Sequence, residues 1–515
     1  MAEAGDQILQ RQRKLEQIIA LGCDPYPHEF HFTDTIPQLL ARHSARTGEE
    51  LERERVNVKL CGRILTLRLH GKAGFAHLQN EGGKLQVYVK LDAVGERGFA
   101  LFQLLDLGDI VGVEGHLFRT RTGELTVHIS ALTFLAKALL PLPEKWHGLA
   151  DVEIRYRQRY LDLISNERVR EIFLARARII QAIRRFLDSR GYVEVETPAM
   201  QTIASGAAAR PFVTHHNAFD IDLYLRIALE LPLKRLIVGG LDRVYEIGRI
   251  FRNEGVSTQH NPEFTMLEFY QAYANYRDLM QLTEEMLTTV VREIAGGHTL
   301  TYRGNEMDFS KWRHVSVLEA IVEHWPAAAG QRPTADQLKN PEWLEAAVQR
   351  YNGGARANDR TAIELPAGRD FDPGHVQTAL FEAVTAGAFI QPTLVYDYPA
   401  SVSPLAKTKD DEPAFAERFE VFAGGLELGN AYSELNDPEE QLARFQEQLR
   451  LKKAGFLDTQ EFDQDYVRAL RYGMPPTGGE GIGIDRLTML LTDTHSIREV
   501  ILFPLLRPLE RGESS

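Results

Sequence analysis

Residues 251–270 read FRNEGVSTQHNPEFTMLEFY, and this run points to both a local fold and a chemistry. Arg252 and Glu254 lie two positions apart, so their side chains share a face if the segment is extended. A loop starting at Gly255 and a second run follow, which predicts a β-hairpin. Such a hairpin offers a guanidinium for phosphate, a carboxylate for the adenine amino group and the Phe264 ring for the purine face. These groups match the three parts of ATP, whereas the plainer alternative is an ordinary hairpin with surface charges.

The overall composition is ordinary for a globular protein of two or three domains. The chain has 515 residues, of which 44% are apolar and 25% are charged. We find no run of about eighteen apolar residues and no apolar signal core, so we expect no membrane segment and a cytoplasmic location. The two cysteines, Cys23 and Cys61, lie far apart and lack metal-ligand spacing. We therefore expect neither a disulfide framework nor a zinc site, and both side chains buried or partly buried.

Apolar and polar residues alternate from Val56 to about Phe134. The runs 56–61, 85–90 and 125–129 have the period of two that is typical of half-buried strands. The runs GFAHLQ (74–79) and DIVGVEGHLF (109–118) add two more strands, with a short helix near residues 96–105. Five strands with a helix between the third and the fourth predict an OB-fold barrel.

The charge distribution keeps nucleic acid possible as a partner of this barrel. A net charge of −13 is unfavourable on average, because phosphate contacts supply most non-specific affinity. OB-folds commonly bind single strands by stacking bases on aromatic rings beside basic groups, roles that Phe75 and Arg68 can fill. A solvated basic face, with Phe75 in the barrel core, is the alternative. The basic residues gather in one early segment: Arg53, Arg55, Lys59, Arg63, Arg68 and Lys72.

A second domain follows Pro141 and Pro143, which mark a boundary near residue 145. Apolar spacing predicts a helix over 168–189 and then a strand over 192–200, in which Pro198 cannot continue a ladder. The block PPTGGEGIGIDRLTMLLT, residues 475–492, places close-packing glycines before a helix that begins near Asp485. Arg486 then stands at a helix N-terminus, where an anion can bind. It also replaces the third glycine of the dinucleotide-binding fingerprint, so we reject that fold.

Together these blocks resemble the class II aminoacyl-tRNA synthetases, and most closely their lysyl-tRNA synthetase branch. Residues 251–270 are similar to motif 2 and residues 475–492 to motif 3, and the helix and strand before Pro198 resemble motif 1, the dimer interface of that family. The run GRILTLRLHGKAGFAHLQ (62–79) resembles the anticodon-binding domain of the same branch. The resemblance covers roughly residues 20–508 and implies an α+β multidomain fold. An N-terminal OB-fold β-barrel is followed by a class II catalytic domain built on an antiparallel sheet flanked by helices.

The resemblance also suggests where the parts begin and end. We expect an N-terminal helical extension over 1–55, the OB-fold over 56–145 and the catalytic domain over 146–515. A helical insertion is expected at about 275–375, and residues 326–373 within it match no function. The chain departs from the family at Leu229 and Pro232, which leaves open how the back of the substrate pocket is built.

Three acidic residues near the nucleotide-binding elements, Glu230, Glu268 and Glu434, indicate the substrate, because acids are unusual beside ATP. A substrate with two ammonium groups, such as lysine, explains them, since charges moved out of water need partners. The resemblance implies that these carboxylates hold the amino groups of lysine. It also assigns four further residues to the same pocket: Gly206, Tyr270, Asn430 and Tyr432.

The remaining site residues are likewise implied by the resemblance. Glu420 and Glu427 are expected to hold Mg²⁺, with up to three ions per subunit that bridge the ATP phosphates. Arg252 and Arg486 are the expected catalytic residues; no general base is needed, because the attacking carboxylate is already ionised. The expected ATP contacts are Arg252, Glu254, His260, Asn261, Phe264, Glu420 and Arg486. The expected anticodon contacts are Arg68, Phe75, Gln86 and Glu124.

The implied function is that of a ligase which activates L-lysine with ATP and then transfers it to the 3′ end of tRNA(Lys). The resemblance further implies a homodimer joined through the catalytic domain. Three alternatives stay open. A paralogue that lysylates a protein typically lacks the OB domain, and dinucleoside polyphosphate synthesis is a side activity of the same site. A nucleic-acid-binding protein with an inactive catalytic domain would be expected to lose Arg252, Glu420, Glu427 or Arg486, and all four are present.

Overall fold

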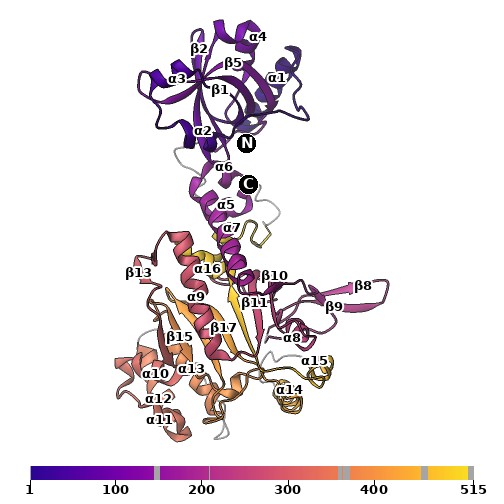
Figure 1. The fold of residues 1–515 in the computed structure, drawn as a ribbon, viewed down its shortest axis with the longest axis vertical. Helices are drawn as coiled ribbons and strands as arrows, with labels where there is room; N and C mark the ends of the chain where they lie inside the picture. The colour runs from indigo at the N-terminus through magenta and orange to yellow at the C-terminus, as the bar shows by residue number, and fades with distance from the viewer. Residues whose placement is uncertain are drawn as a thin grey trace. The chain divides into compact units, whose positions relative to one another are not determined.

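The chain forms two compact units, Met1–Arg170 and Glu171–Ser515, each of which is described by itself (Figure 1). The computed structural model describes residues 2–143, 151–207, 209–357, 362–363, 372–453 and 462–508. The boundary predicted near residue 145 lies outside the described residues. Among the residues that are described, no helix combines the length and apolarity that crossing a membrane requires.

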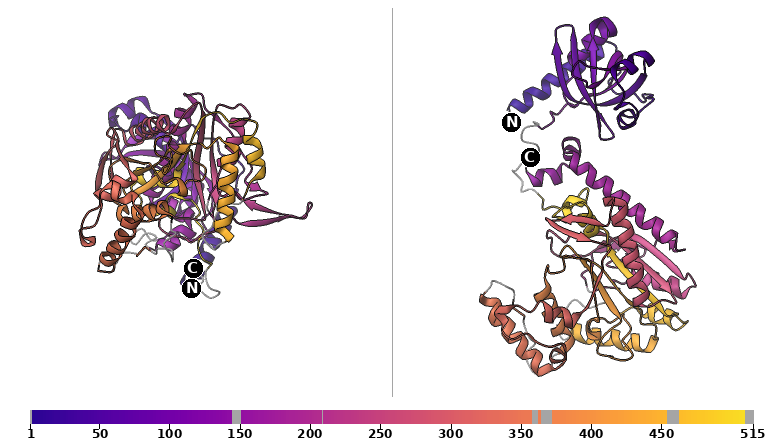
Figure 2. Two further views of the ribbon diagram at one scale, coloured as in Figure 1. Left: turned by 90° about the horizontal axis from the view of Figure 1, so that it is seen from below. Right: turned by 60° about the vertical axis from the view of Figure 1, so that its left-hand side comes forward.

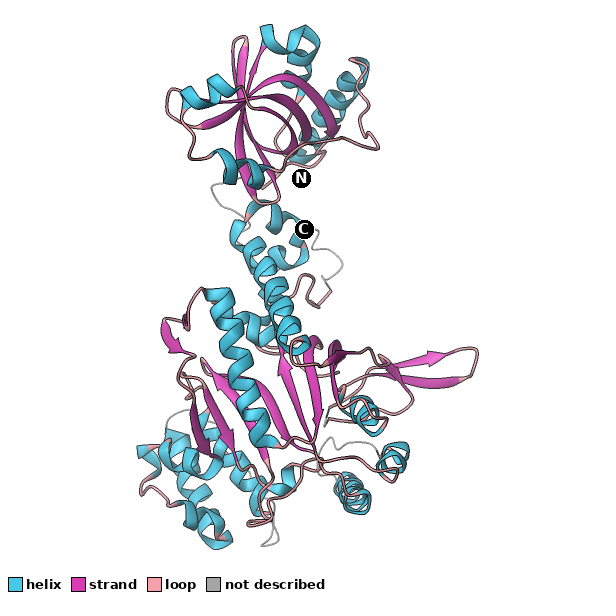
Figure 3. Cartoon of the chain, in the orientation of Figure 1, coloured by secondary structure: helices cyan, strands magenta, loops and turns pink. Residues whose placement is uncertain are grey.

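A closed five-stranded barrel, in the order β1-β2-β3-β5-β4, dominates the first unit (Figure 3). Side chains alternate between the barrel interior and its surface, and Leu60, Val87 and Val127 belong to the buried core. The predicted OB-fold is thereby confirmed. The strands are β1 (Asn57–His70), β2 (Ala73–Asn80), β3 (Gly83–Lys90), β4 (Ile110–Arg119) and β5 (Leu125–Ala136).

The first unit also contains helices, which precede, interrupt and follow the barrel strands along the chain. The predicted helix between the third and fourth strands is α4 (Leu91–Leu104), which begins five residues earlier than expected and is kinked at Gly95, where φ is +72°. Cys23 and Cys61 are both partly buried, as predicted. The other helices of this part of the chain are α1 (Ala2–Ala20), α2 (Ile36–His43), α3 (Gly48–Glu54), α5 (Val152–Arg157) and α6 (Arg159–Ser165).

An eight-stranded sheet forms the centre of the second unit, in the order β14-β15-β16-β17-β18-β11-β10-β6. The pairs at its two edges are parallel and all inner pairs are antiparallel, which confirms the predicted fold class. Helices α7 (Glu167–Asp188) and α9 (Tyr276–Ala295) bury apolar faces in the main core together with residues of the sheet. The strands are β6 (Val193–Glu194), β10 (Arg243–Phe251), β11 (Glu263–Ala272), β14 (Arg313–Ser316), β15 (Thr393–Tyr396), β16 (Arg418–Ala423), β17 (Leu426–Ser433) and β18 (Thr477–Gly483).

The predicted hairpin of residues 251–270 is formed by β10 and β11, which pair antiparallel with Ile250 opposite Phe264. The prediction that Arg252 and Glu254 share a face of an extended strand is wrong. β10 ends at Phe251, and the backbone N–H of Glu254 bonds to the carbonyl of Arg252, which turns the chain. The long loop between the strands therefore carries most of the predicted nucleotide contacts.

The helix predicted over 168–189 is confirmed by α7, but the strand predicted over 192–200 is wrong for most of its length. Only Val193–Glu194 joins the central sheet, as β6. Thr197 turns its backbone N–H to the carboxylate of Glu246 instead of to a neighbouring strand. β7 (Met200–Gln201) then joins a separate small sheet with β9 (Ile221–Leu225) and β8 (Val213–His216), a hairpin that extends away from the central sheet (Figure 2).

The range 275–375, predicted as a helical insertion, contains β-strands as well as helices. α9 packs on the central sheet, and the small hairpin β12 (Thr299–Tyr302) and β13 (Asn305–Asp308) follows it. A separate apolar core lies among the later helices. These are α10 (Val317–Glu323), α11 (Ala335–Lys339), α12 (Pro341–Ala357) and α13 (Pro373–Thr385). The helices that complete the second unit are α8 (Glu230–Val238), α14 (Pro438–Lys453), α15 (Gln464–Leu470), α16 (Ile484–Leu491) and α17 (Ile497–Val500).

Candidate active site

Two cavities in the second unit share a wall. The first has a volume of about 430 Å³ and the second of about 380 Å³. Four residues line both cavities: Arg252, Met266, Asn430 and Gly481. Because Arg252 lines both cavities, a ligand in one cavity can share this cation with a ligand in the other.

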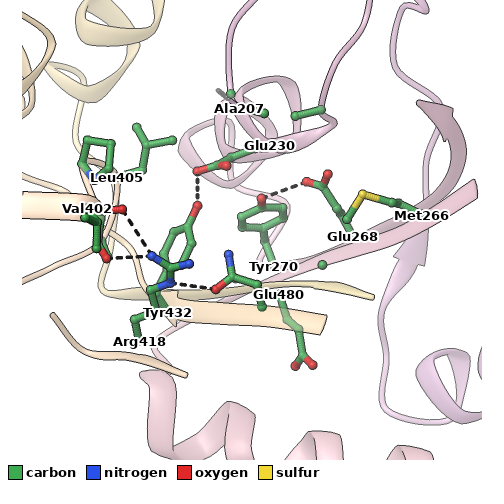
Figure 4. A pocket seen from close by; sticks show the side chains of 18 of the residues that line it. Ala207, Glu230, Met266, Glu268, Tyr270, Val402, Leu405, Arg418, Tyr432 and Glu480 are labelled. Atoms are coloured by element: carbon green, nitrogen blue, oxygen red, sulfur yellow. Dashed lines mark hydrogen bonds between the residues drawn. The ribbon is translucent and has the colours of Figure 1, made fainter. Parts of the chain in front are cut away.

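The first cavity is acidic and holds its carboxylates with tyrosine hydroxyls (Figure 4). Glu230 accepts a hydrogen bond from the Tyr432 hydroxyl at 2.6 Å. Glu268 accepts one from the Tyr270 hydroxyl at 3.2 Å and another from the backbone N–H of Leu229 at 3.1 Å. The structure brings six of the residues predicted for lysine to this one cavity: Gly206, Glu230, Glu268, Tyr270, Asn430 and Tyr432.

The seventh, Glu434, lies beneath the cavity wall and is only 2% exposed. Its carboxylate forms an ion pair with Lys234 of α8, a residue that the sequence prediction missed. Lys234 is fully buried and also pairs with Glu230. The four-residue spacing of Glu230 and Lys234 was a usable signal, since helix residues four apart face each other.

The protonation of this cluster follows from burial and from neighbouring charge. Burial raises the pKa of Glu268 to about 7, and the Glu230 carboxylate adds to the rise. Burial alone would lower the pKa of Lys234, but Glu230 and Glu434 outweigh it and raise the pKa, so Lys234 stays protonated. Burial also raises the tyrosine pKa values of Tyr270 and Tyr432 well above their usual range, so both hydroxyls keep their protons at neutral pH.

Leu229 and Pro232, the two positions at which the chain departs from the family, both fit the structure at the back of the first cavity. The Leu229 side chain is buried in an apolar cluster, while its backbone N–H fixes Glu268. Pro232 is the third residue of α8, where a backbone N–H has no intrahelical partner to lose. Leu229 therefore holds a cavity carboxylate through its backbone, and Pro232 is accommodated in the first turn of α8.

The glycines of β18 leave room for the side chains of Glu434 and Tyr270 to pack against the backbone of this strand. A Cβ atom on Gly479 of β18 would lie 2.1 Å from Oε1 of Glu434 and 2.4 Å from the Tyr270 ring. Any larger residue would therefore displace one of these groups. This observation agrees with the close packing predicted for the glycines of residues 475–492.

The second cavity combines cations with an aromatic face. The Arg252 guanidinium lies 5.3 Å from the centre of the Phe264 ring, and its Nε donates to the backbone carbonyl of Ile227 at 3.4 Å. Such a cavity suits a nucleotide, because guanidinium groups bind phosphate and an aromatic ring stacks on a base. The predicted ATP residues that line it are Arg252, Glu254, His260, Asn261, Phe264 and Arg486.

Arg486 lies in the first turn of α16, as predicted. Its Nη1 donates to the backbone carbonyl of Glu427 at 2.9 Å, and its Nη2 lies 3.3 Å from Nε2 of His260. The neighbouring Asp485 is buried and accepts the backbone N–H of Thr265 at 2.7 Å. Asp485 also pairs with Arg176 of α7 at 2.7 Å, so the start of α16 is fixed against β11.

Glu420 and Glu427, the residues predicted for a metal, lie on the neighbouring strands β16 and β17. Glu420 accepts from the Tyr398 hydroxyl and pairs with Arg418, both at 2.7 Å. Burial raises the pKa of Glu420 to about 7 against the opposing effect of Arg418, and the charge of Glu427 adds to the rise. A divalent cation would relieve this repulsion, so the pair fits Mg²⁺. In the described part of the chain, no group of three or more His, Cys, Asp or Glu side chains could hold a metal.

The residues predicted for the anticodon lie on the surface of the barrel in the first unit. The ring of Phe75 is partly buried and packs 4.8 Å from the Tyr88 ring, while its neighbour Ala76 faces the core. Gln86 donates to the carboxylate of Glu124 at 2.8 Å. Arg68 is exposed and lies opposite Phe75 in the register of β1 and β2. The barrel-core alternative for Phe75 does not agree with this position, which is on the outer face.

Comparison with known proteins matches both units. Residues 151–507 match the family model of "tRNA synthetases class II (D, K and N)", and residues 58–135 match that of the "OB-fold nucleic acid binding domain". Two proteins named "Lysine--tRNA ligase" are similar to this chain. The one from Moorella thermoacetica is 52% identical over 97% of both chains, and the one from Halalkalibacterium halodurans is 49% identical over 98% of this chain and 97% of its own. With its catalytic sheet, its barrel and these matches, the chain belongs to the class II tRNA synthetases of the D, K and N group.

Proposed function

We propose that this protein is a lysine–tRNA ligase, which joins L-lysine to ATP as lysyl-adenylate, releases pyrophosphate, and transfers lysine to the 3′ end of tRNA(Lys). The observation that carries the proposal is the position of Arg252 between an acidic cavity and a cavity with the groups for a nucleotide. The relatives with that printed name match nearly the whole chain and support the proposal.

Charge selects lysine in the first cavity. Glu230, Glu268 and Glu434 compensate the two ammonium groups, and the hydroxyls of Tyr270 and Tyr432 fix two of these carboxylates. Gly206 and Asn430 complete the lining. Aspartate would place a second carboxylate against this acidic wall, which is unfavourable where charges are removed from water.

The chemistry needs no general base from the chain. The lysine carboxylate is ionised at neutral pH and can attack the α-phosphorus directly. Arg252 can bind this carboxylate and the α-phosphate together and so stabilise the charge that develops between them. Arg486 faces the departing pyrophosphate and Phe264 stacks on adenine. Glu254, His260 and Asn261 hold the rest of the nucleotide.

Glu420 and Glu427 would hold Mg²⁺, with up to three ions per subunit. Magnesium prefers oxygen ligands and is commonly bound by one or two carboxylates together with substrate phosphates, which matches this pair. When bound, the metal would neutralise the charge of the ATP phosphates.

The proposal extends to the whole chain. The outer face of the barrel, with Arg68, Phe75, Gln86 and Glu124, would bind the anticodon loop. We assign 1–55 to a helical extension, 56–145 to the anticodon-binding domain and 146–515 to the catalytic domain with its insertion at about 275–375. The protein would act in the cytoplasm as a homodimer joined through the catalytic domain.

The decisive experiment is amino-acid-dependent exchange of pyrophosphate into ATP without tRNA. Lysine should support exchange, and aspartate, asparagine and arginine should be weaker by about 10⁴-fold, because the buried carboxylates need matching partners. Equal rates with aspartate and lysine would overturn the assignment. Charging of tRNA(Lys) with radiolabelled lysine then tests the second step.

A further inference from the structure

Lys234 is a cation of the chain placed among carboxylates that the proposed function gives to the substrate. Its Nζ pairs with Glu230 of α8 and with Glu434 after β17. The two partners lie 204 positions apart in the sequence, so this one ammonium group joins two elements of the fold. Its side chain has no exposed surface, although Glu230 itself lines the first cavity.

We propose that Lys234 is a positioning and specificity-determining residue: it holds Glu230 and Glu434 in place and sets the charge of the cavity for a ligand with one net positive charge. This inference rests on the proposed function and identifies how the same site recognises its substrate.

The charge balance supports the inference. In the form of the cavity in which Glu268 is ionised, Glu230, Glu268 and Glu434 bring three negative charges, whereas Lys234 and Arg252 bring two positive ones. Of the other ionisable residues that line the cavity, Arg418 pairs with Glu420, His375 pairs with Asp372, and the pKa of Glu480 is raised by burial to about 8. The cavity is therefore left with one negative charge. Zwitterionic lysine, with two ammonium groups and one carboxylate, carries the single positive charge that neutralises it. Without Lys234, lysine would leave a buried negative charge uncompensated, which is costly.

The other groups around Lys234 cannot replace its charge. The rings of Tyr432 and Tyr466 lie 5.4 and 5.9 Å from its Nζ, and both carry neutral hydroxyls at neutral pH. Arg235, the next residue of α8, pairs with Asp463 and Asp465. Glu268 and Tyr270 face the same carboxylates from β11. None of these neighbours supplies the charge that Glu230 and Glu434 lose with Lys234, so its removal favours protonation of these two carboxylates.

Lys234→Met tests this role, because methionine fills most of the volume without the charge. Exchange kinetics are measured between pH 6 and 9 with lysine and with ATP as the varied substrate. We expect the KM for lysine at pH 7 to rise at least tenfold while the KM for ATP changes less than threefold. The acidic limb of the pH profile of kcat/KM for lysine should move up by one pH unit or more, because loss of a nearby cation raises carboxylate pKa values.

The barrel offers a matched control. Lys137 is also fully buried and pairs with two carboxylates, those of Asp106 at 2.7 Å and Asp109 at 2.6 Å. Lys137→Met should leave the lysine KM and the acidic limb of exchange at their wild-type values. Lys234→Arg keeps the charge, so its acidic limb should stay at the wild-type pH even if the KM changes.

The outcomes separate the two proposals. Absence of lysine-dependent exchange in the wild-type protein would contradict the proposed function. An active wild type with an unshifted acidic limb in Lys234→Met would overturn the inference alone. If Lys234→Met does not fold, Lys234→Gln takes its place in the same assay. Failure of both neutral variants to fold would also count against the inference, because it would make Lys234 a stability element.

Discussion

Burial of Glu268 in the first cavity makes the charge of this residue depend on pH near neutrality. Its carboxylate accepts hydrogen bonds from Tyr270 and from the backbone of Leu229, which favour the ionised form. Burial and the charge of Glu230 act in the opposite direction and prevail, with a pKa of about 7. Near neutral pH, the free protein is therefore divided between the protonated and ionised states of this residue.

We predict that lysine binds more weakly as the pH falls below about 7. An ammonium group needs the ionised carboxylate, so the KM for lysine should rise by up to tenfold for each pH unit between 7 and 5.5. The measurement is the pH profile of kcat/KM for lysine in the exchange assay. Tyr270→Phe removes a hydrogen bond to the ionised form and should move this limb to higher pH. A flat profile over this range would contradict the assignment of Glu268.

Arg252 is predicted to serve the transition state. Arg252→Ala should lower kcat for lysine-dependent exchange by about 10²- to 10³-fold, since removal of one preorganised donor has effects of this size. The thermal unfolding transition and tRNA binding should stay close to wild type. Arg252→Lys should recover only part of the rate, because an ammonium group lacks the planar fork of guanidinium. Wild-type exchange in a folded Arg252→Ala protein would refute this role.

Among single residues, the sequence could predict a role in the site for those whose types are unusual for their surroundings. The acids Glu230 and Glu268, beside a nucleotide motif, pointed to a basic substrate, and both line the first cavity. Arg418 escaped prediction because nothing local distinguishes it, although it donates to Asn430 at 2.9 Å and pairs with Glu420. Its role depends on pairing between β16 and β17, which spacing along the chain does not reveal.

Among the elements, β18 and α9 are joined by a buried polar contact behind the first cavity. Oγ1 of Thr283 lies 2.7 Å from the carbonyl of Leu279 and 2.5 Å from Oε2 of Glu480. The hydroxyl has one proton to share between the two oxygens, and its donation to Glu480 favours the ionised carboxylate, whereas burial acts in the opposite direction and prevails. Burial raises the pKa of Glu480 to about 8, which agrees with a protonated side chain at neutral pH.

Glu480→Gln should therefore stabilise the second unit at high pH. The folded protein keeps a proton on Glu480 that the unfolded chain loses above about pH 4.5, so the free energy of unfolding falls as the pH rises from there to about 8. Each unit of pKa shift corresponds to about 1.4 kcal/mol, so the variant should gain a few kcal/mol at pH 8 relative to pH 4.5. Urea unfolding at both pH values measures the difference. Equal pH dependence in both proteins would show that Glu480 ionises freely.

Elements with a continuous apolar pattern were predicted well. The spacing of Ile179, Ile183 and Phe186 identified α7, and strict alternation identified the barrel strands. The strand at 192–200 failed because its backbone bonds go to a side chain and to a second small sheet. The turn at Arg252–Glu254 failed for a related reason, since a backbone bond within the loop ended β10 early.

For the whole molecule, the barrel and the catalytic sheet are separate compact units, and the two proposed steps make different demands on them. Under the proposed function, exchange would need only the cavities of the second unit. Under the proposed function, charging of tRNA would also need the outer face of the barrel, where Phe75 lies beside Tyr88. Variants in the first unit can therefore separate the two activities.

Phe75→Ala should weaken aminoacylation of tRNA by about ten- to a hundredfold, since stacking on one base contributes about 1–3 kcal/mol. Lysine-dependent exchange should change less than twofold. Both rates are measured on one preparation, with a melting curve of the same sample. Unaltered aminoacylation would eliminate the stacking role, whereas an early unfolding transition would indicate that Phe75 mainly supports the barrel. Thr122→Ala, at an exposed turn of the same barrel, is the control and should affect neither rate.

The wall that Arg252 contributes to both cavities has a thermodynamic consequence. A ligand that orders this guanidinium changes the site that the other ligand meets, so the two affinities are coupled. Equilibrium linkage requires the coupling to be reciprocal: the factor by which ATP changes the affinity for the amino acid equals the factor by which the amino acid changes the affinity for ATP. The fraction of protein with one cavity occupied therefore depends on the concentrations of both substrates.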